Sequence, residues 1–273
     1  MKTSRKQISQ FRRGRVSVQR EVVKQRRIRD GLERSLNKNL KSLFGKFVNT
    51  RAFLYKEFGQ FDEAVATREL QSDLFPALQR HYRRVFNTIY SNNNKLKAVE
   101  AKDDVMVFDR SVDLEPILNR YFRTRELILV GISTNMATRV RRIISQGRRD
   151  NLTLTEIARN IETKVRPIAI NRAATIARTE THNAAGFASH EYYKQVETDF
   201  GSTMYKKWAA TGDGRTRDAH RAMNAKEPIP MNEDFLVGGS PMKHTGDPRG
   251  GARNNVNCRC VIIYVDEQDV VLD

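Results

Sequence analysis

Apolar residues recur at three-to-four spacing through much of residues 16–90, and this periodicity constrains the fold more than any other feature. Residues three or four apart share one face of an α-helix, so the pattern predicts a long helix with an apolar stripe. The stripe comprises Leu32, Leu36, Leu40, Leu43, Phe44 and Phe47. A second helical stretch is expected from Phe61 to Tyr90, with Pro76 marking a start or a kink. The Ser-Asn-Asn-Asn run at 91–94 predicts a loop.

The middle of the chain continues the helical pattern. Asp113 precedes a helix expected to run through Gln146, with Gly147 as its stop. Thr153 and Glu156 have the spacing of a capping box, which predicts the start of a short helix.

A long alanine-rich helix is expected next, with Pro167 at its first position. Its many small residues would let another segment approach the helix closely, which favours packing over chemistry.

The net charge indicates the kind of partner that the protein binds. The chain has 273 residues, with 49 Lys and Arg against 32 Asp and Glu, a formal charge of +17. Such a charge favours a polyanion, with nucleic acid first and an acidic protein surface second. The charge is densest in residues 1–51, which hold sixteen basic residues and three acidic ones.

Two interpretations of this basic segment stay open. It is a solvated tail, or it contacts phosphates directly and without sequence preference, since no recognition-helix pattern or aromatic platform appears. We expect the first fifteen or so residues to be disordered or ordered by a partner. The candidate contacts with DNA or a partner are Arg12, Arg13, Arg15, Arg20, Lys24, Arg26, Arg27 and Arg29.

Several protein classes are excluded. No apolar run is long enough to cross a bilayer, so no membrane partner is expected. The basic N-terminus lacks the apolar stretch of a secretory signal. Two cysteines are too few for disulfides to stabilise a protein of this size, which favours a reducing compartment.

The last quarter of the chain has a different sequence pattern, with short strands and turns in place of long helices. A strand is expected at 204–210, then a tight turn, then a helix at 216–223 with Thr216 as its N-cap. Residues 224–257 look loop-rich, and a β-branched strand is expected from Cys258 to Val265. The expected fold class is therefore α+β, a mostly helical N-terminal region followed by a small C-terminal α+β domain.

Both cysteines lie in this block, at Cys258 and Cys260. On a strand, residues two apart point to one face. With His220 and His244 they could form a structural zinc site, although this spacing is tighter than the usual one. The alternative is that both thiols pack in a small core, with no cofactor.

An enzymatic interpretation is also open. A cysteine nucleophile could pair with His220, and Asp213 could position a substrate. More often an Asp-x-Arg turn such as Asp213 with Arg215 and Arg217 ties a turn to a neighbouring loop. We favour this bracing role and assign no catalytic residue.

The order of these residues resembles that of the Mu F-like head morphogenesis, or minor head, proteins of tailed bacteriophages. The resemblance covers residues 150–265. It rests on the sequence Ala-Arg-Thr-Glu-Thr at 177–181, on Trp208, Asp213, Arg215, Arg217, His220 and Pro241, and on 246–248 and 257–260.

The resemblance implies a structural role for the motif residues. Trp208 is expected to anchor a core, and Cys258 and Cys260 to be core thiols or zinc ligands. The remaining structural positions are Arg178, Glu180, Asp213, Arg215, Arg217, His220, Asp247 and Asn257. It also implies a non-enzymatic virion protein inside the head at the portal vertex, made in the host cytoplasm.

The partners implied are the portal protein, the major capsid or scaffold protein, and double-stranded DNA bound without specificity. Alternatives are an enzyme acting on nucleic acid or nucleotides through His220, Asp213 and the cysteines, and a plain DNA-binding protein. We expect a basic arm and helix at 1–51, a helical region at 52–150 and a Mu F-like domain at 151–273. The chain ends eight residues after Val265, so no fused toxin or enzyme domain is expected there.

Overall fold

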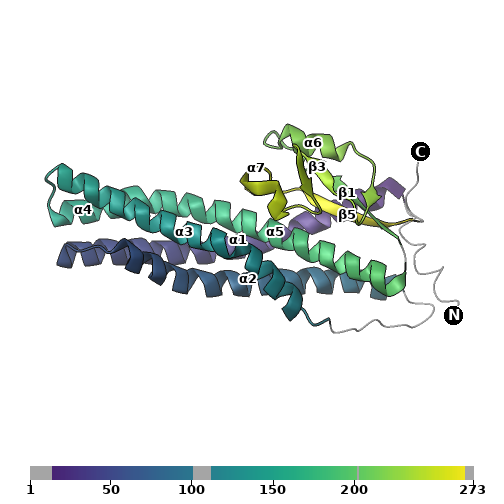
Figure 1. Ribbon diagram of the computed structural model, residues 1–273, viewed down its shortest axis with the longest axis horizontal. Helices are drawn as coiled ribbons and strands as arrows, with labels where there is room; N and C mark the ends of the chain where they lie inside the picture. The colour runs from purple at the N-terminus through teal and green to yellow at the C-terminus, as the bar shows by residue number, and fades with distance from the viewer. Residues whose placement is uncertain (1–13, 101–111, 202, 268–273) are drawn as a thin grey trace. The chain divides into compact units, whose positions relative to one another are not determined.

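The computed structural model describes residues 14–100, 112–201 and 203–267. Long helices precede a small β-containing region (Figure 1). The helices are α1 (Gly14–Phe58), α2 (Glu63–Glu100), α3 (Glu115–Arg149), α4 (Leu154–Asn160) and α5 (Arg166–Phe200), with a π-helical turn, η1 (Ile161–Val165), between the last two. The expected α+β class is confirmed. No helix among the described residues is long and apolar enough to cross a membrane.

The chain forms two compact units. Unit 1 contains residues 1–32, 83–118 and 179–273, and unit 2 contains residues 33–82 and 119–178. Because α1, α2, α3 and α5 each contribute to both units, the boundaries between the units fall inside helices.

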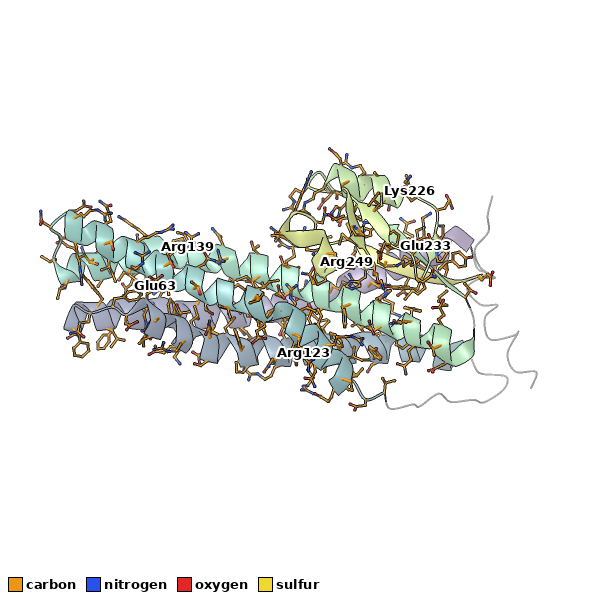
Figure 2. The ribbon with its side chains drawn as sticks, viewed as in Figure 1. Glu63, Arg123, Arg139, Lys226, Glu233 and Arg249 are labelled. Atoms are coloured by element: carbon orange, nitrogen blue, oxygen red, sulfur yellow. The ribbon has the colours of Figure 1, made fainter. Side chains whose placement is uncertain are left out.

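Unit 2 consists of helices and their short connections, with no strand among its described residues. Its segments of α1, α2, α3 and α5 lie side by side (Figure 1), and the apolar stripe of α1 is buried at Leu36, Leu40 and Phe44. Polar contacts join the helices at their edges. Glu63 of α2 (Figure 2) accepts a hydrogen bond from Thr138 and pairs with Arg141 at 2.6 Å, both residues of α3.

Unit 1 contains all the strands. In the three-stranded antiparallel sheet, the order is β2 (Ile229–Pro230), β1 (Met204–Ala209) and β5 (Val261–Asp266). A separate hairpin pairs β3 (Phe235–Val237) with β4 (Ser240–Met242) through Gly238 and Gly239, both at positive φ, as a tight hairpin turn requires. Short helices α6 (Asp218–Asn224), η2 (Pro248–Gly250) and α7 (Gly251–Asn255) connect the strands.

Two expectations for the helices were wrong. The loop expected at 91–94 is helical, because α2 continues to Glu100. Tyr90, just before it, is buried edge-to-face against Tyr192, and Asn92 donates to the Thr88 carbonyl one turn back. Gly147 is not the stop of α3, which ends at Arg149 in a Schellman motif with Asn151 at positive φ.

Two expectations for the C-terminal region also needed correction. Helix α6 begins at Asp218 with Arg217 as its cap, whereas Thr216 donates its hydroxyl hydrogen to Asp213. Strand β5 begins at Val261, so both cysteines precede it. Asn257 at positive φ and the bond from Cys258 N–H to the Asn255 carbonyl hold this lead-in as a turn.

Candidate functional site

The core of unit 1 is arranged around Trp208. Strand β1 alternates in burial, which places Met204, Lys206 and Trp208 on its inner face. The Trp208 ring packs edge-to-face against Phe235 and against His220, each with a centroid distance of 5.4 Å. Trp208 therefore connects β1 to the hairpin and to α6.

His220 and the two cysteines form a buried cluster. His220 Nδ1 lies 3.4 Å from Cys260 Sγ and 3.6 Å from Cys258 Sγ. The hydrogen bond from Cys258 lowers the pKa of the Cys260 thiol, and His220 lowers it further against the opposing effect of burial. The same hydrogen bond, together with burial, raises the pKa of Cys258.

Arg29 of α1 extends into the same core. It is fully buried, and its Nη1 donates to the Cys260 carbonyl at 3.3 Å. Burial lowers its pKa to about 10, an effect that the nearby Tyr264 and thiols partly offset. Sequence reasoning missed this role, although Arg29 lies three residues before Leu32 and therefore shares the face of the apolar stripe.

Hydrogen bonds hold the turn before α6. Asp213 accepts hydrogen bonds from the Thr216 hydroxyl at 2.9 Å and from the Arg215 N–H at 3.1 Å. The Thr216 bond is the main cause that lowers the pKa of Asp213. Arg217 donates to the Val256 carbonyl at 2.6 Å, which ties this turn to the segment before the cysteines. The Arg215 side chain is exposed.

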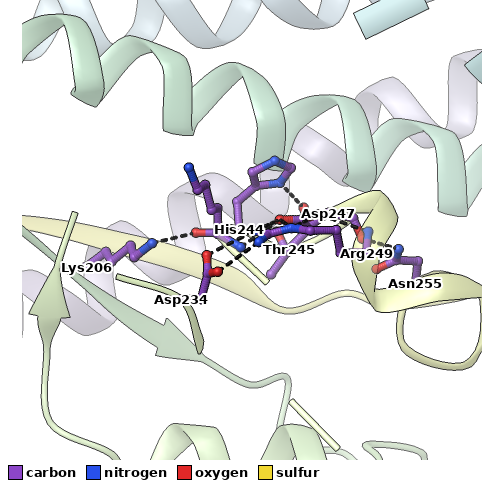
Figure 3. A network of polar contacts seen from close by, with 8 residues as sticks. Lys206, Asp234, His244, Thr245, Asp247, Arg249 and Asn255 are labelled. Atoms are coloured by element: carbon purple, nitrogen blue, oxygen red, sulfur yellow. Dashed lines mark hydrogen bonds and ion pairs between the residues drawn. The ribbon is translucent and has the colours of Figure 1, made fainter. Parts of the chain in front are cut away.

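A second polar network is centred on Asp247 (Figure 3). Its carboxylate accepts from the backbone N–H groups of Lys243 at 2.7 Å and Arg249 at 3.0 Å, and pairs with the Arg249 guanidinium at 2.8 Å. Arg249 also forms a two-pronged ion pair with Asp234, at 2.8 and 2.9 Å. Burial raises the pKa of Asp247, but the hydrogen bonds from Arg249 and the backbone outweigh it and lower the value to about 2.

Buried Lys206 and Asn255 extend this network. Lys206 Nζ donates to the Lys243 carbonyl at 3.0 Å, and Asn255 donates to the Asp247 carbonyl at 2.6 Å. Burial lowers the pKa of Lys206 to about 8. Sequence reasoning selected Asp247 and missed Lys206 and Asn255. For Lys206, the signal was its position on the inward face of β1.

The loop that carries Asp247 lies directly on α5. A Cβ atom at Gly186 would lie 2.0 Å from the Thr245 carbonyl oxygen, and one at Gly246 would lie 2.4 Å from the Asn183 Cα. The His244 ring packs against Phe187 and His190 of α5. The structure therefore does not bring His244 to the cysteines, and the four-ligand zinc hypothesis is corrected on this point.

The motif at 177–181 falls where α5 passes from unit 2 to unit 1. In unit 2, Arg178 Nε pairs with Glu33 at 3.1 Å. In unit 1, the Thr179 hydroxyl accepts from the Asn257 N–H at 3.1 Å, and Glu180 is buried. Thr179, a residue of this motif, thus contacts Asn257 directly.

The basic residues of the N-terminal segment divide into three groups. Arg12 and Arg13 lie outside the described residues, and Arg15 is on α1. Arg26 donates to the Ala210 carbonyl at 2.7 Å and Arg29 is buried, so both act inside unit 1. Arg29 is not accessible to DNA, and the expectation for it was wrong. The others line a shallow concavity of about 580 Å³, formed by Gln19, Arg20, Val23, Lys24, Arg27, Ile28 and Asn92.

Residues 134–263 match the family described as Phage Mu protein F like protein. Over these residues, just under half of its length, the chain is similar to the Mu protein F-like family. It is also similar to the minor head protein GP7 of Bacillus phage SPP1, with 32% identity over 132 residues. That match covers 46% of this chain and 40% of the relative, so the chain spans about two fifths of the relative's length. No solved structure matches.

Proposed function

We propose that the chain is a minor head protein of a tailed bacteriophage, located inside the head at the portal vertex and acting in head assembly. The observation that carries this proposal is the family match, which covers Gly186, Trp208, Asp247 and both cysteines. These residues brace unit 1. The relative is named a minor head protein, which supports the same role here.

The proposed mechanism is assembly by contact and not catalysis. His220, Cys258 and Cys260 are 1%, 4% and 3% exposed, so a substrate has no access to the thiols. Truncation of a buried structural residue destabilises the protein, whereas truncation of a catalytic residue lowers turnover and leaves the fold intact. We expect His220→Ala to lower the unfolding midpoint of unit 1, followed by the fluorescence of Trp208, the sole tryptophan.

The proposed partners are the portal protein, the capsid or scaffold protein, and double-stranded DNA bound without specificity during packaging or ejection. Among the candidate DNA contacts, those with accessible side chains in the described residues are Arg20, Lys24 and Arg27. For protein, α3 presents exposed apolar side chains at Leu127, Ile128 and Val130, and Leu127 is 85% exposed. Clustered exposed apolar side chains are typical of interaction sites.

Co-expression with the portal, scaffold and coat proteins of the same phage tests the proposal. We expect the chain to co-sediment with procapsids in far fewer copies than the coat protein. Leu127→Glu should reduce its incorporation. Leu236→Glu is the matched control, because Leu236 is 64% exposed on the hairpin of unit 1 and should tolerate the change. Absence of the chain from procapsids and virions alike would contradict the proposal.

A further inference from the structure

Three soft or borderline ligand atoms converge in the core of unit 1. His220 Nδ1, Cys258 Sγ and Cys260 Sγ all lie within 4.8 Å of one another. They come from two segments, the first turn of α6 and the turn before β5. Sulfur and imidazole ligands together are the donor set that Zn²⁺ prefers in proteins.

The measured separations fit a tetrahedral site. With Zn–S bonds of about 2.3 Å and Zn–N bonds of about 2.0–2.1 Å, two ligands at the tetrahedral angle lie about 3.6 Å apart. The two nitrogen–sulfur distances are 3.4 and 3.6 Å. A cation could therefore enter between the three atoms with little movement of the backbone.

The orientation of His220 favours a metal cation bound by Nδ1 and both sulfur atoms over a hydrogen bond from Nδ1 to one sulfur atom. Its Nδ1 faces both sulfur atoms, and one N–H can point well at only one of them. The other ring nitrogen, Nε2, is buried without a hydrogen-bond partner among the described residues. With Nδ1 bound to a metal, Nε2 would carry the ring proton. The His220 ring packs edge-to-face with Trp208, with the ring centroids 5.4 Å apart.

We propose that Cys258, Cys260 and His220 bind one zinc ion, which has a structural role. Three protein ligands leave the fourth position for a water molecule. The ion would join residues 38 and 40 positions apart in the chain. The intervening strands β2, β3 and β4 are only two or three residues long, so this region has few ladder hydrogen bonds of its own. A metal therefore adds stability where the secondary structure supplies little.

The test uses the full chain, produced without a histidine tag and purified without chelators. We expect about one zinc per chain by elemental mass spectrometry. Chelation should lower the thermal midpoint and change Trp208 fluorescence, and one equivalent of zinc should restore both. Cobalt in place of zinc should give the absorption bands of tetrahedral thiolate coordination.

Variants separate this ligand set from its alternatives. Cys258→Ser, Cys260→Ser and His220→Ala should each lose the zinc. His244→Gln is the control and should retain it, because His244 packs against Phe187 and His190 instead. The cobalt spectrum of the unmodified chain keeps the test decisive if a variant fails to fold. A chain purified without zinc that also fails to bind cobalt would overturn the proposal, as would copper as the bound metal or retention of zinc by His220→Ala.

Discussion

At the scale of single residues, two glycines determine how closely residues 243–247 approach α5. The Thr245 carbonyl oxygen occupies the space that a side chain at position 186 would need. Gly246 has a φ of +82° and faces the Asn183 backbone in the same way. The loop carries Asp247 and His244, so these two positions set the geometry of the polar network.

Gly186→Ala should destabilise unit 1. The new methyl group would meet backbone atoms, which cannot rotate away, so we expect a cost of about 1–3 kcal/mol or more from overpacking. Denaturation followed by Trp208 fluorescence measures it. Gly214→Ala is the matched control in the same unit, since nothing lies within 4 Å of the position that its methyl group would take and no positive φ is involved. Equal midpoints for the two variants would contradict this account.

Asp247 makes the stability of unit 1 depend on pH. Its folded pKa, about 2, lies below the ordinary value of 3.8, so it stabilises the fold above pH 4. This contribution is lost as the pH falls from about 4 to about 2. A shift of this size corresponds to about 2 kcal/mol, and the low exposure of the side chain, 6%, limits screening by solvent.

Asp247→Asn should remove this contribution at neutral pH. The stability curves of the variant and the parent should converge towards pH 2, where the parent carboxylate is about half protonated. Urea denaturation at a series of pH values, followed by Trp208 fluorescence, checks it. Asp218→Asn serves as the control, because that side chain is fully exposed. Curves that stay parallel down to pH 2 would rule out Asp247 as the source.

At the scale of elements, the junction between α3 and α4 is well specified. Leu152 N–H bonds to the Gly147 carbonyl at 2.9 Å and Asn151 N–H to the Arg148 carbonyl at 3.2 Å, which complete the Schellman motif. Thr153 and Glu156 then form the capping box predicted from their spacing. Gly147 serves another purpose, since a Cβ atom there would lie 2.5 Å from Ile157.

Thr153→Ala should cost unit 2 about 1 kcal/mol, because the Glu156 N–H loses its side-chain acceptor at the start of α4. Far-ultraviolet circular dichroism during denaturation measures this loss. The Trp208 transition, which reports unit 1, should not move. Thr163→Ala is the control, since its hydroxyl only bonds back to the Arg159 carbonyl one turn away. A larger loss in Thr163→Ala than in Thr153→Ala would refute the role of the cap.

At the scale of the whole molecule, the charge of +17 is not all free to meet a partner. Arg29 and Lys206 are completely buried, and Arg249 is committed to two aspartates. Net charge still predicts attraction to DNA, but the contacts must come from the cations that remain at the surface.

DNA affinity should fall steeply with salt, because each neutralised phosphate releases condensed counterions. Replacement of Arg20, Lys24 and Arg27 by alanine should reduce the slope of log affinity against log salt by up to about 3. Fluorescence anisotropy with duplexes of unrelated sequence measures it. The matched control removes three exposed cations of unit 1 elsewhere, Arg221, Lys226 and Arg253. An equal reduction in both triple variants would show that only net charge matters.

The sequence determined the features that depend on neighbours a few residues apart. The apolar stripe of α1, the capping box at Thr153 and strand β1 follow from local periodicity and spacing. The order of polar residues in the last quarter was sufficient to indicate the family.

Only the tertiary structure decided which polar residues meet. Helix α2 continues through 91–94, next to the contact of Tyr90 with Tyr192, which is distant in sequence. Arg29 is buried, and His220 rather than His244 joins the cysteines, because the segments that surround each of them come from distant parts of the chain. Such contacts depend on how whole elements pack, and local sequence patterns indicate which face of a helix is buried but not which distant segment it meets.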